Sequence, residues 1–591
     1  MAARTRGTAW VDPAPPRWKT PEFLAYLSIV AVALGYMCYA TYHLSRPQRG
    51  APFVRALSPG WLFGGRLDNS DPQYRSFRNN IPLLVPVACV YALVSRGLVQ
   101  RSSPRRPATA PSAVSRRRDG YAPLDAATVN TDTAFSLMFS LGFLTVFHGA
   151  SVLKIVVLIT LNFAVVRSLR YSRASVAFAW LYGIGMLYAN HHFQGYPFGA
   201  LAAPLAFLDA PPFTGITGRW WNFFNFTMLR MISFTMDAQW TLSRHSRARP
   251  PSSAAATSRS LARSEGVGMT HEDYTLVAYL AYLLYVPLYL AGPIISFNDW
   301  YLQMSRRRCE ASAMAKVKAD DDAMGWRGIL VYAARWLGCV LLQEAMLHAF
   351  YVVAISRAKA WGGMSPFQVA MVSYFNLKLI WMKLLIIWRF FRLWALMDGV
   401  LTVENMDRCM SNNYSALGFW RHWHRSYNRW LVRYMYVPLG GRRYSIASRF
   451  LVFTFVAVWH DVDPRLLAWG WLVALLILPE VVASAVFRGD HWQRWPPFRH
   501  LCAVGAVFNI LLMMTANLVG FAVGIDGMLS IYARIFQPAG LVFLATTAVA
   551  LFAASQIMFE LERGRQLRAM RAERRQRHGR LPADPDPGSD P

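Results

Sequence analysis

Two histidines stand in surroundings where an ionisable ring is costly. His460 closes the apolar run 450–459, which is hydrophobic enough to lie inside a bilayer or a membrane helix bundle. A titratable side chain at membrane depth is a functional-site hypothesis, although a buried histidine taken alone is more often hydrogen-bonded packing. Burial disfavours the imidazolium form, so His460 is expected to stay neutral and able to accept a proton as a general base.

The second histidine, His424, precedes the first by 36 residues. A turn at 438–441 and the apolar run lie between them, so a hairpin would bring both rings to one internal tunnel. Transfer of an acyl group from a thioester to a hydroxyl needs a base and a donor to the carbonyl oxygen. His460 suits the first task, and His424 the second, or the positioning of the acceptor; interfacial anchoring is the plainer role for His424.

Aromatic and basic residues around His424 repeat at helical spacing. Each set lies on its own face of a helix, and the two faces are adjacent. The aromatic face has Trp420, Trp423, Tyr427, Trp430 and Tyr434, and the basic face has Arg421, Arg425, Arg429 and Arg433. The pattern predicts one interfacial helix with rings at headgroup depth and guanidiniums facing phosphates. Binding of the phosphates of coenzyme A is the sharper alternative for the arginines.

The elements that must position these residues are membrane helices. The chain has 591 residues, of which 54% are hydrophobic, and apolar runs recur along most of its length. This predicts an all-α polytopic membrane protein with about eleven spans and one or two re-entrant pieces. The net charge of +30 comes largely from arginines in loops and tails, where positive charge sets membrane orientation, and no nucleic-acid-binding module is recognisable.

Composition divides the chain into membrane segments and basic linkers. Arg, Pro, Ser and Ala are concentrated in the linkers, and the arginine-dense end predicts a cytosolic C-terminus. The expected divisions are a tail at 1–22, membrane helices at 23–98, a basic loop at 99–130, a membrane domain at 131–561 with polar loops at 243–268 and 304–324, and a basic C-terminal tail at 562–591.

Three further features suggest buried polar structure. Arg230 and Asp237 lie two helical turns apart, so they share a face and would either pair with each other or face a polar cavity; the ion pair is the favoured prediction. Gly292-Pro293 interrupts the span expected at 274–297, so freed backbone groups must be satisfied inside the protein. The six cysteines (38, 89, 309, 339, 409 and 502) show no paired spacing, so neither a disulfide framework nor a metal site is predicted.

The segment 423–441 followed by Trp459-His460 resembles the signature of the membrane-bound O-acyltransferases. Residues 230–234, 291–294 and 388–394 resemble its glycerol-uptake-protein branch, a fungal group implicated in remodelling the lipid of glycosylphosphatidylinositol (GPI) anchors. The resemblance implies a bundle of helices around a central tunnel in the endoplasmic reticulum membrane. It also implies transfer of a long acyl chain from acyl-CoA to the free sn-2 hydroxyl of a lyso-GPI lipid or a related lysophospholipid.

The resemblance carries roles onto particular residues. His460 matches the catalytic histidine of the family, and His424 its second polar position. The residues expected to bind substrate or line the tunnel are Trp423, Arg421, Arg425, Asn428, Arg429, Trp459 and Asn412.

The chain is also similar to hedgehog acyltransferase, which palmitoylates a protein N-terminus. It departs from that relative at His424, where the relative has aspartate, and at the turn 438–441, which favours a lipid acceptor. It shares the pair Arg408-Cys409, whose cysteine ligates haem in the relative; a haem at Cys409 and a plain thiol are both open readings. Two other functions remain as alternatives: transport or regulation of glycerol uptake, and protein acylation or its regulation.

Overall fold

The computed structural model describes residues 15–46, 51–62, 65–102, 126–217, 219–245, 269–313, 325–441, 445–521 and 524–578. Most of the predicted N-terminal tail, of the basic loops 99–130 and 243–268 and of the loop 304–324 lies outside these residues, as does the end of the C-terminal tail. Helix dominates what is described, and a single short hairpin pairs β1 (Leu57–Pro59) with β2 (Arg66–Asp68).

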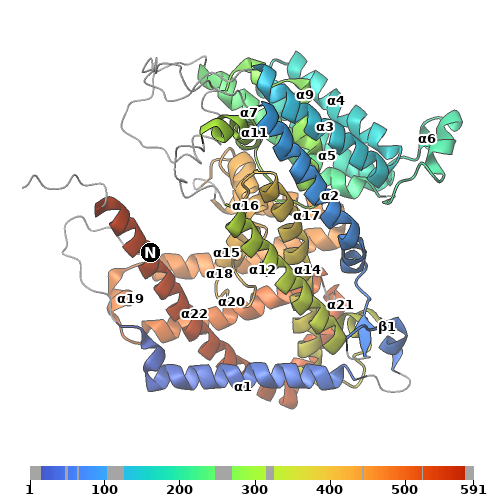
Figure 1. The fold of residues 1–591 in the computed structure, drawn as a ribbon. Helices are drawn as coiled ribbons and strands as arrows, with labels where there is room; N and C mark the ends of the chain where they lie inside the picture. The colour runs from blue at the N-terminus through green and yellow to red at the C-terminus, as the bar shows by residue number, and fades with distance from the viewer. Residues whose placement is uncertain are drawn as a thin grey trace, which may run out of the picture.

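The helices fall into two groups joined by a central set (Figure 1). The first group contains α2 (Pro72–Ser102), α3 (Ala126–His148), α4 (Ser151–Ser168), α5 (Arg173–His192), α7 (Trp221–His245), α9 (Leu276–Leu284), α10 (Val286–Tyr289) and α11 (Phe297–Ala313). The second contains α1 (Pro21–Leu44), α18 (Pro464–Val486), α20 (Phe498–Phe521) and α22 (Pro538–His578). Between them lie α12 (Trp326–Ala349), α14 (Pro366–Met397), α15 (Ala416–His422), α16 (Arg425–Leu431) and α17 (Ser445–His460).

The shorter elements lie at the ends and edges of these groups. They are α6 (Phe198–Leu201), α13 (Val352–Arg357), α19 (Asp490–Arg494) and α21 (Gly524–Ile535), with 3-10 turns at Arg17–Lys19, Pro52–Ala56, Ala203–Asp209 and His271–Asp273. A π-helical turn, Val432–Tyr436, extends α16.

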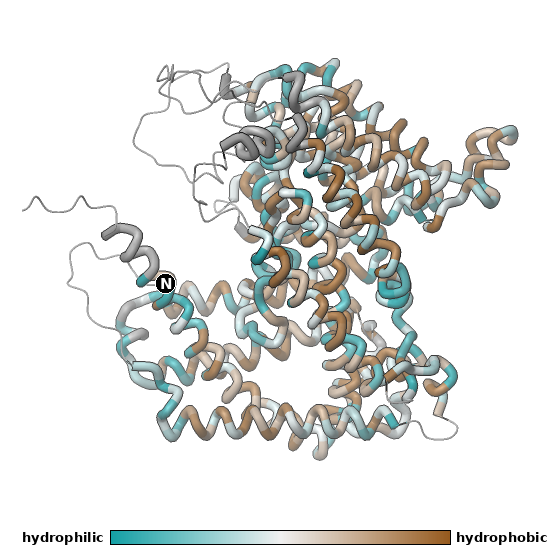
Figure 2. The backbone as a smooth tube through the Cα atoms, viewed as in Figure 1, coloured by the Kyte–Doolittle hydropathy of each residue, from teal (hydrophilic) through white to brown (hydrophobic). Residues whose placement is uncertain are grey.

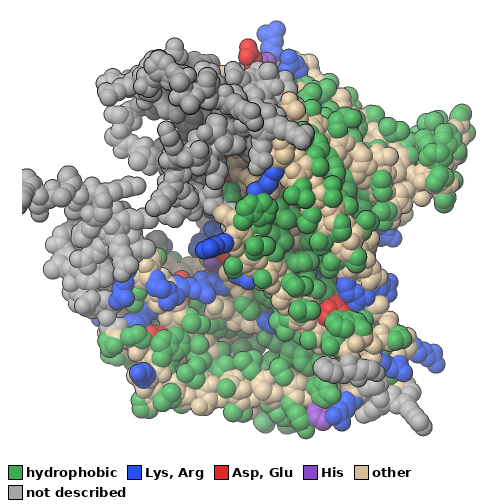
Figure 3. All heavy atoms as spheres, viewed as in Figure 1, with side chains coloured by type: hydrophobic (Ala, Val, Ile, Leu, Met, Phe, Trp, Pro, Cys, Tyr) green, Lys and Arg blue, Asp and Glu red, His purple; other side chains and the backbone are tan. Residues whose placement is uncertain are grey.

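Eight of the described helices are long and apolar enough to cross a membrane: α1, α2, α4, α12, α14, α18, α20 and α22. Hydrophobic residues run along the outer sides of the helices in Figure 2 and cover much of the face seen in Figure 3, as expected for helices that meet lipid. The polytopic all-α prediction is therefore confirmed. The span expected at 274–297 corresponds to the pair α9–α10, which lies outside the eight, as do α3, α5 and α7.

Helix α14 is the central element of the fold. In its most apolar window, 67% of the residues are buried, against 6% for α1. It packs on α1, α2, α10, α12, α13, α20, α21 and α22, and so contacts both helix groups. Its cations have internal partners: Lys383 pairs with Asp71 at 2.5 Å, and Arg389 with Glu404 at 3.2 Å. Because these cations are paired with carboxylates, a helix that carries several positive charges can be buried in the bundle.

The interruption predicted near Gly292-Pro293 is present, and it begins earlier. Helix α9 ends at Leu284, α10 is a single turn to Tyr289, and no regular helix resumes before α11 at Phe297. Pro287 has no N–H to donate, so carbonyl groups of the preceding turn lose their helical partners. Such groups must find donors inside the protein.

Arg230 supplies those donors, so the predicted Arg230–Asp237 pair is wrong. The guanidinium donates to the carbonyl oxygens of Leu283 at 2.8 Å and Leu288 at 2.5 Å, with a longer contact to Tyr282 at 3.4 Å. The residue is 2% exposed. Arg230 and Asp237 share one face of α7, as their spacing predicts. The broken helix that packs against α7, however, presents several carbonyl oxygens to Arg230, and the guanidinium binds these instead of Asp237.

Asp237 instead binds the end of the segment that carries His424. Its carboxylate accepts from Arg433 at 2.9 Å and from the Tyr434 hydroxyl at 2.9 Å, while its other oxygen accepts from the backbone of Asn298 at 3.2 Å. Asp237 is fully buried. These bonds fix the π-helical turn against α7 and α11.

We expect Arg230→Met to destabilise the fold by about 3 kcal/mol, because the carbonyl oxygens of Tyr282 and Leu283 would lose the guanidinium and that of Leu288 would keep only the N–H of Gly292. The measurement is the midpoint of heat-induced unfolding of the purified protein in detergent. Arg219→Met, which removes an exposed arginine just before α7, is the matched control and should leave the midpoint unchanged. Equal midpoints for the two variants would contradict the capping role of Arg230.

Candidate active site

The predicted single helix around His424 is two helices with a sharp break. Helix α15 ends at His422, and α16 starts at Arg425. His424 sits at the break with φ 43° and ψ 53°, in the left-handed region that few non-glycine residues adopt. The interfacial prediction is therefore wrong, and the rings are core residues instead: Tyr427 is 4% exposed, and Trp430 and Tyr434 are each 2% exposed.

Asn405 stabilises the break between α15 and α16. Its backbone carbonyl accepts from the N–H of Arg425 at 3.0 Å, and its side-chain oxygen accepts from the N–H of Ser426 at 3.1 Å. These two N–H groups open α16 and have no partner within the helix. Ser426 in turn accepts from the backbone N–H of Ile294 at 2.9 Å, so the broken segment after α10 and the break at His424 support each other.

The His424 ring is clamped between aromatic side chains. It stacks on Trp388 of α14, with the ring centroids 4.3 Å apart and the planes 20° from parallel. Tyr427 lies 5.2 Å away and Trp459 6.4 Å away. The ring is 6% exposed, and its Nε2 atom is buried with no hydrogen-bond partner among the described residues, as is the Tyr427 hydroxyl. Two buried polar atoms therefore lie side chain to side chain in this cluster without a partner among the described residues.

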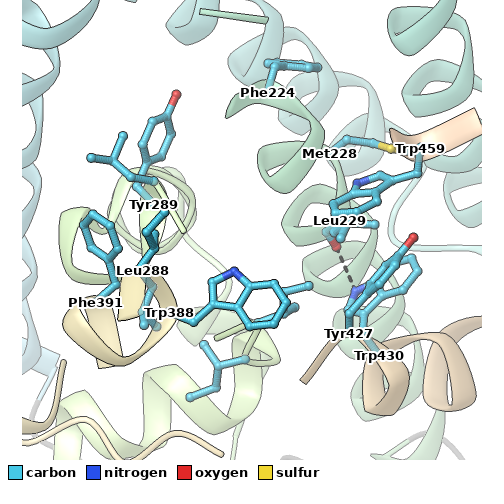
Figure 4. Close-up of a cluster of buried hydrophobic side chains, with 14 of the residues drawn as sticks. Phe224, Met228, Leu229, Leu288, Tyr289, Trp388, Phe391, Tyr427, Trp430 and Trp459 are labelled. Carbon is cyan, nitrogen blue, oxygen red and sulfur yellow. Dashed lines mark hydrogen bonds between the residues drawn. The ribbon is translucent and has the colours of Figure 1, made fainter. Parts of the chain in front are cut away.

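His460 ends α17, and its neighbour Trp459 anchors that end. The Trp459 indole donates to the carbonyl of Asn225 at 2.9 Å, and the Asn225 amide donates to the carbonyl of Trp459 at 2.7 Å. Trp459 also packs on Tyr427 at 4.4 Å, which joins α17 to α16 beside His424. Figure 4 shows Tyr427, Trp430 and Trp459 gathered on one side, with Trp388 reaching toward them from the other.

Both histidines line one internal cavity of about 1720 Å³. The His460 side chain has a large accessible surface although protein surrounds it. That surface faces the cavity. The Trp459 ring is near both histidines, with its centroid 6.4 Å from that of His424 and 4.9 Å from that of His460. The tunnel predicted from the hairpin thus has a counterpart in the structure, walled mainly by apolar side chains of α1, α2, α3, α7, α14, α17, α18, α20 and α22.

The other predicted site residues divide by whether they reach this cavity. Those that line it are Arg421, Trp423, Asn428 and Trp459; those that do not are Arg425, Arg429 and Asn412. Arg425 is paired with Asp407 at 3.0 Å, and Arg429 is exposed away from the lining. The residue after Asn412, Asn413, does line the cavity.

Three lining residues were not singled out for the site by sequence reasoning. Tyr427 follows His424 by one helical turn, and Arg449 precedes His460 by three turns, so helical spacing carried a signal for both. Trp388 lies on a helix distant in sequence, and only the packing of α14 against the break brings it onto His424.

The surroundings of Cys409 do not fit a haem ligand. The thiol is exposed, its Sγ lies 3.6 Å from the Lys378 ammonium, and it is absent from the cavity lining. Arg408 beside it is bound to Glu562 at 2.7 Å. Across the described residues, no three His, Cys, Asp or Glu side chains form a group that would hold a metal ion.

Comparison with known proteins decides the family. The model of the membrane-bound O-acyltransferase family matches residues 212–525, which include the broken segment after α10 and both histidines. The chain belongs to this family. It is an acyltransferase of the multi-pass membrane type.

Two relatives are similar over nearly the whole chain. Membrane-bound O-acyltransferase GUP1 of Saccharomyces cerevisiae is 40% identical over 556 residues, covering 93% of this chain and 92% of the relative. The protein of the same name from Schizosaccharomyces pombe is 38% identical, covering 91% of this chain and 88% of the relative. The mouse protein-cysteine N-palmitoyltransferase HHAT is 28% identical over 218 residues, which is 35% of this acyltransferase and 40% of the relative.

We expect Trp388→Ala to lower the kcat of acyl transfer about tenfold or more, because the stacked ring that orients His424 would be lost. Trp388→Phe keeps an aromatic face and should recover most of the rate. Steady-state turnover of the purified enzyme measures both variants. Equal rates for the alanine and phenylalanine variants would remove the positioning role of the indole.

Proposed function

We propose that this acyltransferase moves a long acyl chain from acyl-CoA to the free sn-2 hydroxyl of a lyso-GPI anchor lipid. The observation that carries the proposal is the pair of histidines on one apolar cavity of about 1720 Å³. That volume exceeds the ~300–1,000 Å³ of ordinary small-molecule pockets, as two amphipathic substrates together require. Similarity to the GUP1 relatives, which are named O-acyltransferases, over nine tenths of the chain supports transfer to a hydroxyl group.

In this proposal His460 is the general base. Its imidazole takes the proton of the acceptor hydroxyl as that oxygen attacks the thioester carbonyl carbon. The carbon–sulfur bond then breaks, and the CoA sulfur leaves with the proton returned by the imidazolium. An ester and free CoA result, so protons and electrons balance without another reactant.

His424 is proposed to stabilise the carbonyl oxygen. Its Nε2 atom is buried and unpartnered, and in the tautomer that carries hydrogen on Nε2 it donates to the oxyanion as charge develops. The stack on Trp388 and the left-handed backbone hold the ring in place before substrate arrives. Preorganisation of this kind removes the reorientation cost at the moment of reaction.

The proposed location is the endoplasmic reticulum membrane with a cytosolic C-terminus. Helix α22 extends beyond its apolar part to His578 and carries Arg563, Arg565, Arg568 and Arg571 on this extension. A cluster of arginines directly after a span favours the cytosolic side.

We expect His460→Ala to abolish acyl transfer, with a loss of at least about a thousandfold, while the protein remains folded and inserted. The assay follows radiolabelled acyl groups from acyl-CoA into lipid. The control is His500→Ala, which removes a histidine outside the cavity lining and should keep full turnover. Unchanged turnover in His460→Ala would remove the base assignment.

The acceptor is tested separately, by lipid mass spectrometry of GPI anchors in cells that lack the protein. Accumulated lyso-anchors, restored to normal by the wild-type chain and not by His460→Ala, are expected. A normal anchor profile would reject the GPI acceptor. Acyl transfer by the purified enzyme to an N-terminal cysteine peptide would then favour the protein-acylating alternative.

A further inference from the structure

One part of the cavity wall carries amide and hydroxyl side chains that the mechanism above does not use. Gln73, Ser76 and Asn80 lie on one face of the first turns of α2, and Asn222 lies in the first turn of α7; all four line the cavity. We refer to these four residues as the polar set. None of them is buried, so a molecule in the cavity can reach them.

Most of the hydrogen-bonding capacity of the polar set is unused. The side chains of Gln73, Ser76 and Asn222 have no hydrogen-bond partner among the described residues. The Asn80 amide donates to the backbone carbonyl of Ser76 at 2.8 Å, which leaves the side-chain oxygen of Asn80 free to accept. A ligand with several hydroxyl groups would satisfy these donors and acceptors.

The α2 part of the polar set lies beside the aromatic clamp on His424. Phe77, which lies within this part of α2, packs on Phe391 of α14 with the ring centroids 6.5 Å apart. Phe391 follows Trp388 by about one helical turn, and Trp388 carries the stack on His424. This face of α2 is therefore next to one of the two histidines.

The α7 part lies beside the other histidine. Asn225, one turn after Asn222, exchanges two hydrogen bonds with Trp459, the neighbour of His460. At 1.5 Å per residue, Asn222 is about 5 Å from that anchor along the axis of α7. A molecule whose hydroxyl group is at His460 therefore has the polar set around its adjoining part.

The charges of the cavity wall disfavour a cationic head group here. The described part of the lining includes Lys383, Arg421 and Arg449, and no Asp or Glu side chain. Lys383, the cation nearest to the start of α2, is paired with Asp71 at 2.5 Å. An ammonium group, as in ethanolamine or a peptide N-terminus, would meet cations and no carboxylate. A trimethylammonium group has no hydrogen to donate to amide and hydroxyl oxygens.

Helix α2 also lies outside the residues that the family model matches, which begin at 212. The printed names of the GUP1 and HHAT relatives give different acceptor atoms, oxygen and nitrogen. The acceptor therefore varies within the family, whereas the matched domain is shared. A wall of the cavity built by a helix outside that domain is suited to select the acceptor.

We infer that the polar set binds the hydroxyl groups of a polyhydroxylated acceptor head group, such as the inositol ring of a lysophosphoinositide. This subsite rests on the proposed reaction at His460. A side-chain amide donates to one hydroxyl of a neighbouring pair and accepts from the other. About six bonds, or roughly 7 Å, separate the sn-2 oxygen of such a lipid from its ring, so the ring reaches the polar set while the hydroxyl stays at His460.

The test measures equilibrium binding of two lysolipids with the same acyl chain, lysophosphatidylinositol and lysophosphatidylcholine, to the purified full-length protein. The wild type is expected to bind the inositol lipid at least about tenfold more tightly. Asn80→Leu and Asn222→Leu should each raise the Kd of the inositol lipid about tenfold, the effect of losing one or two neutral hydrogen bonds. Ser76→Ala should raise it about threefold, and the Kd of the choline lipid should stay unchanged in all three.

Asn79→Leu is the matched control, because Asn79 is exposed on the same helix as Asn80 and lies outside the cavity lining. It should change neither Kd. Every variant should bind the uncleavable donor analogue S-hexadecyl-CoA like the wild type, which shows that the cavity is intact. If a leucine variant loses this binding, Ser76→Ala, which removes a single oxygen atom, decides the result.

Three results would overturn the subsite. The first is equal weakening of both lysolipids by the variants of the polar set, and the second is weakening of neither. The third is displacement of lysophosphatidylinositol by millimolar free glycerol, which would assign the polar set to a soluble polyol.

The subsite and the proposed function fail in different ways. If the polar set gives selectivity for the inositol lipid but cells that lack the protein have normal GPI anchors, the GPI acceptor is wrong and the subsite stands. If lyso-anchors accumulate in those cells and the variants bind both lysolipids like the wild type, the subsite is wrong and the function stands.

Discussion

The need to satisfy every backbone polar group inside the membrane governs this fold. A helix can be interrupted there only where the protein itself supplies donors and acceptors. Two breaks among the described helices concern the site, one after Leu284 and one at His424. Arg230 donates to the freed carbonyl groups of the first, and Asn405 accepts from the freed N–H groups of the second. Ser426 ties the two together through Ile294. The active-site geometry is a product of these breaks.

Buried ion pairs decide which charges remain for substrate. Asp237, Glu404 and Asp71 are each committed to cations from other elements, and these pairs allow strongly charged helices to sit in the centre of the bundle. Once these pairs are formed, the cavity wall retains few charges without a partner. A cavity with so few polar groups gives each of them a large influence on what binds, since apolar walls alone discriminate weakly between lipids.

The residues that position the two histidines are distinct from the histidines proposed to react. His424 is fixed by the stack on Trp388, whereas His460 is fixed through its neighbour Trp459, which exchanges two hydrogen bonds with Asn225. The rings are therefore positioned from α14 and α7, two helices that carry neither of them. The same apolar cavity leaves room for chains of both substrates, so acyl and acceptor preference would be set by its shape.

The sequence alone was enough to predict the class of fold and the two histidines. Apolar runs of spanning length, a proline–glycine break and a histidine ending an apolar segment are local features, and each is written in consecutive residues. Reasoning from local sequence failed where a residue's contacts come from a segment far away in the chain. It placed Trp430 and Tyr434 at an interface, and it paired Arg230 with Asp237, because periodicity on one helix says nothing about what lies opposite.

Only the tertiary structure decided which residues surround the cavity. The sequence pointed to Arg425, which is paired with Asp407, and not to Arg449, which lines the cavity and has a buried Nη1 atom without a partner among the described residues. The left-handed break at His424 and its stack on Trp388 likewise depend on segments far apart in the chain. Hydrophobicity and period are properties of short stretches, whereas the pairing of charges and rings depends on which helices pack together, and that was settled by the whole bundle.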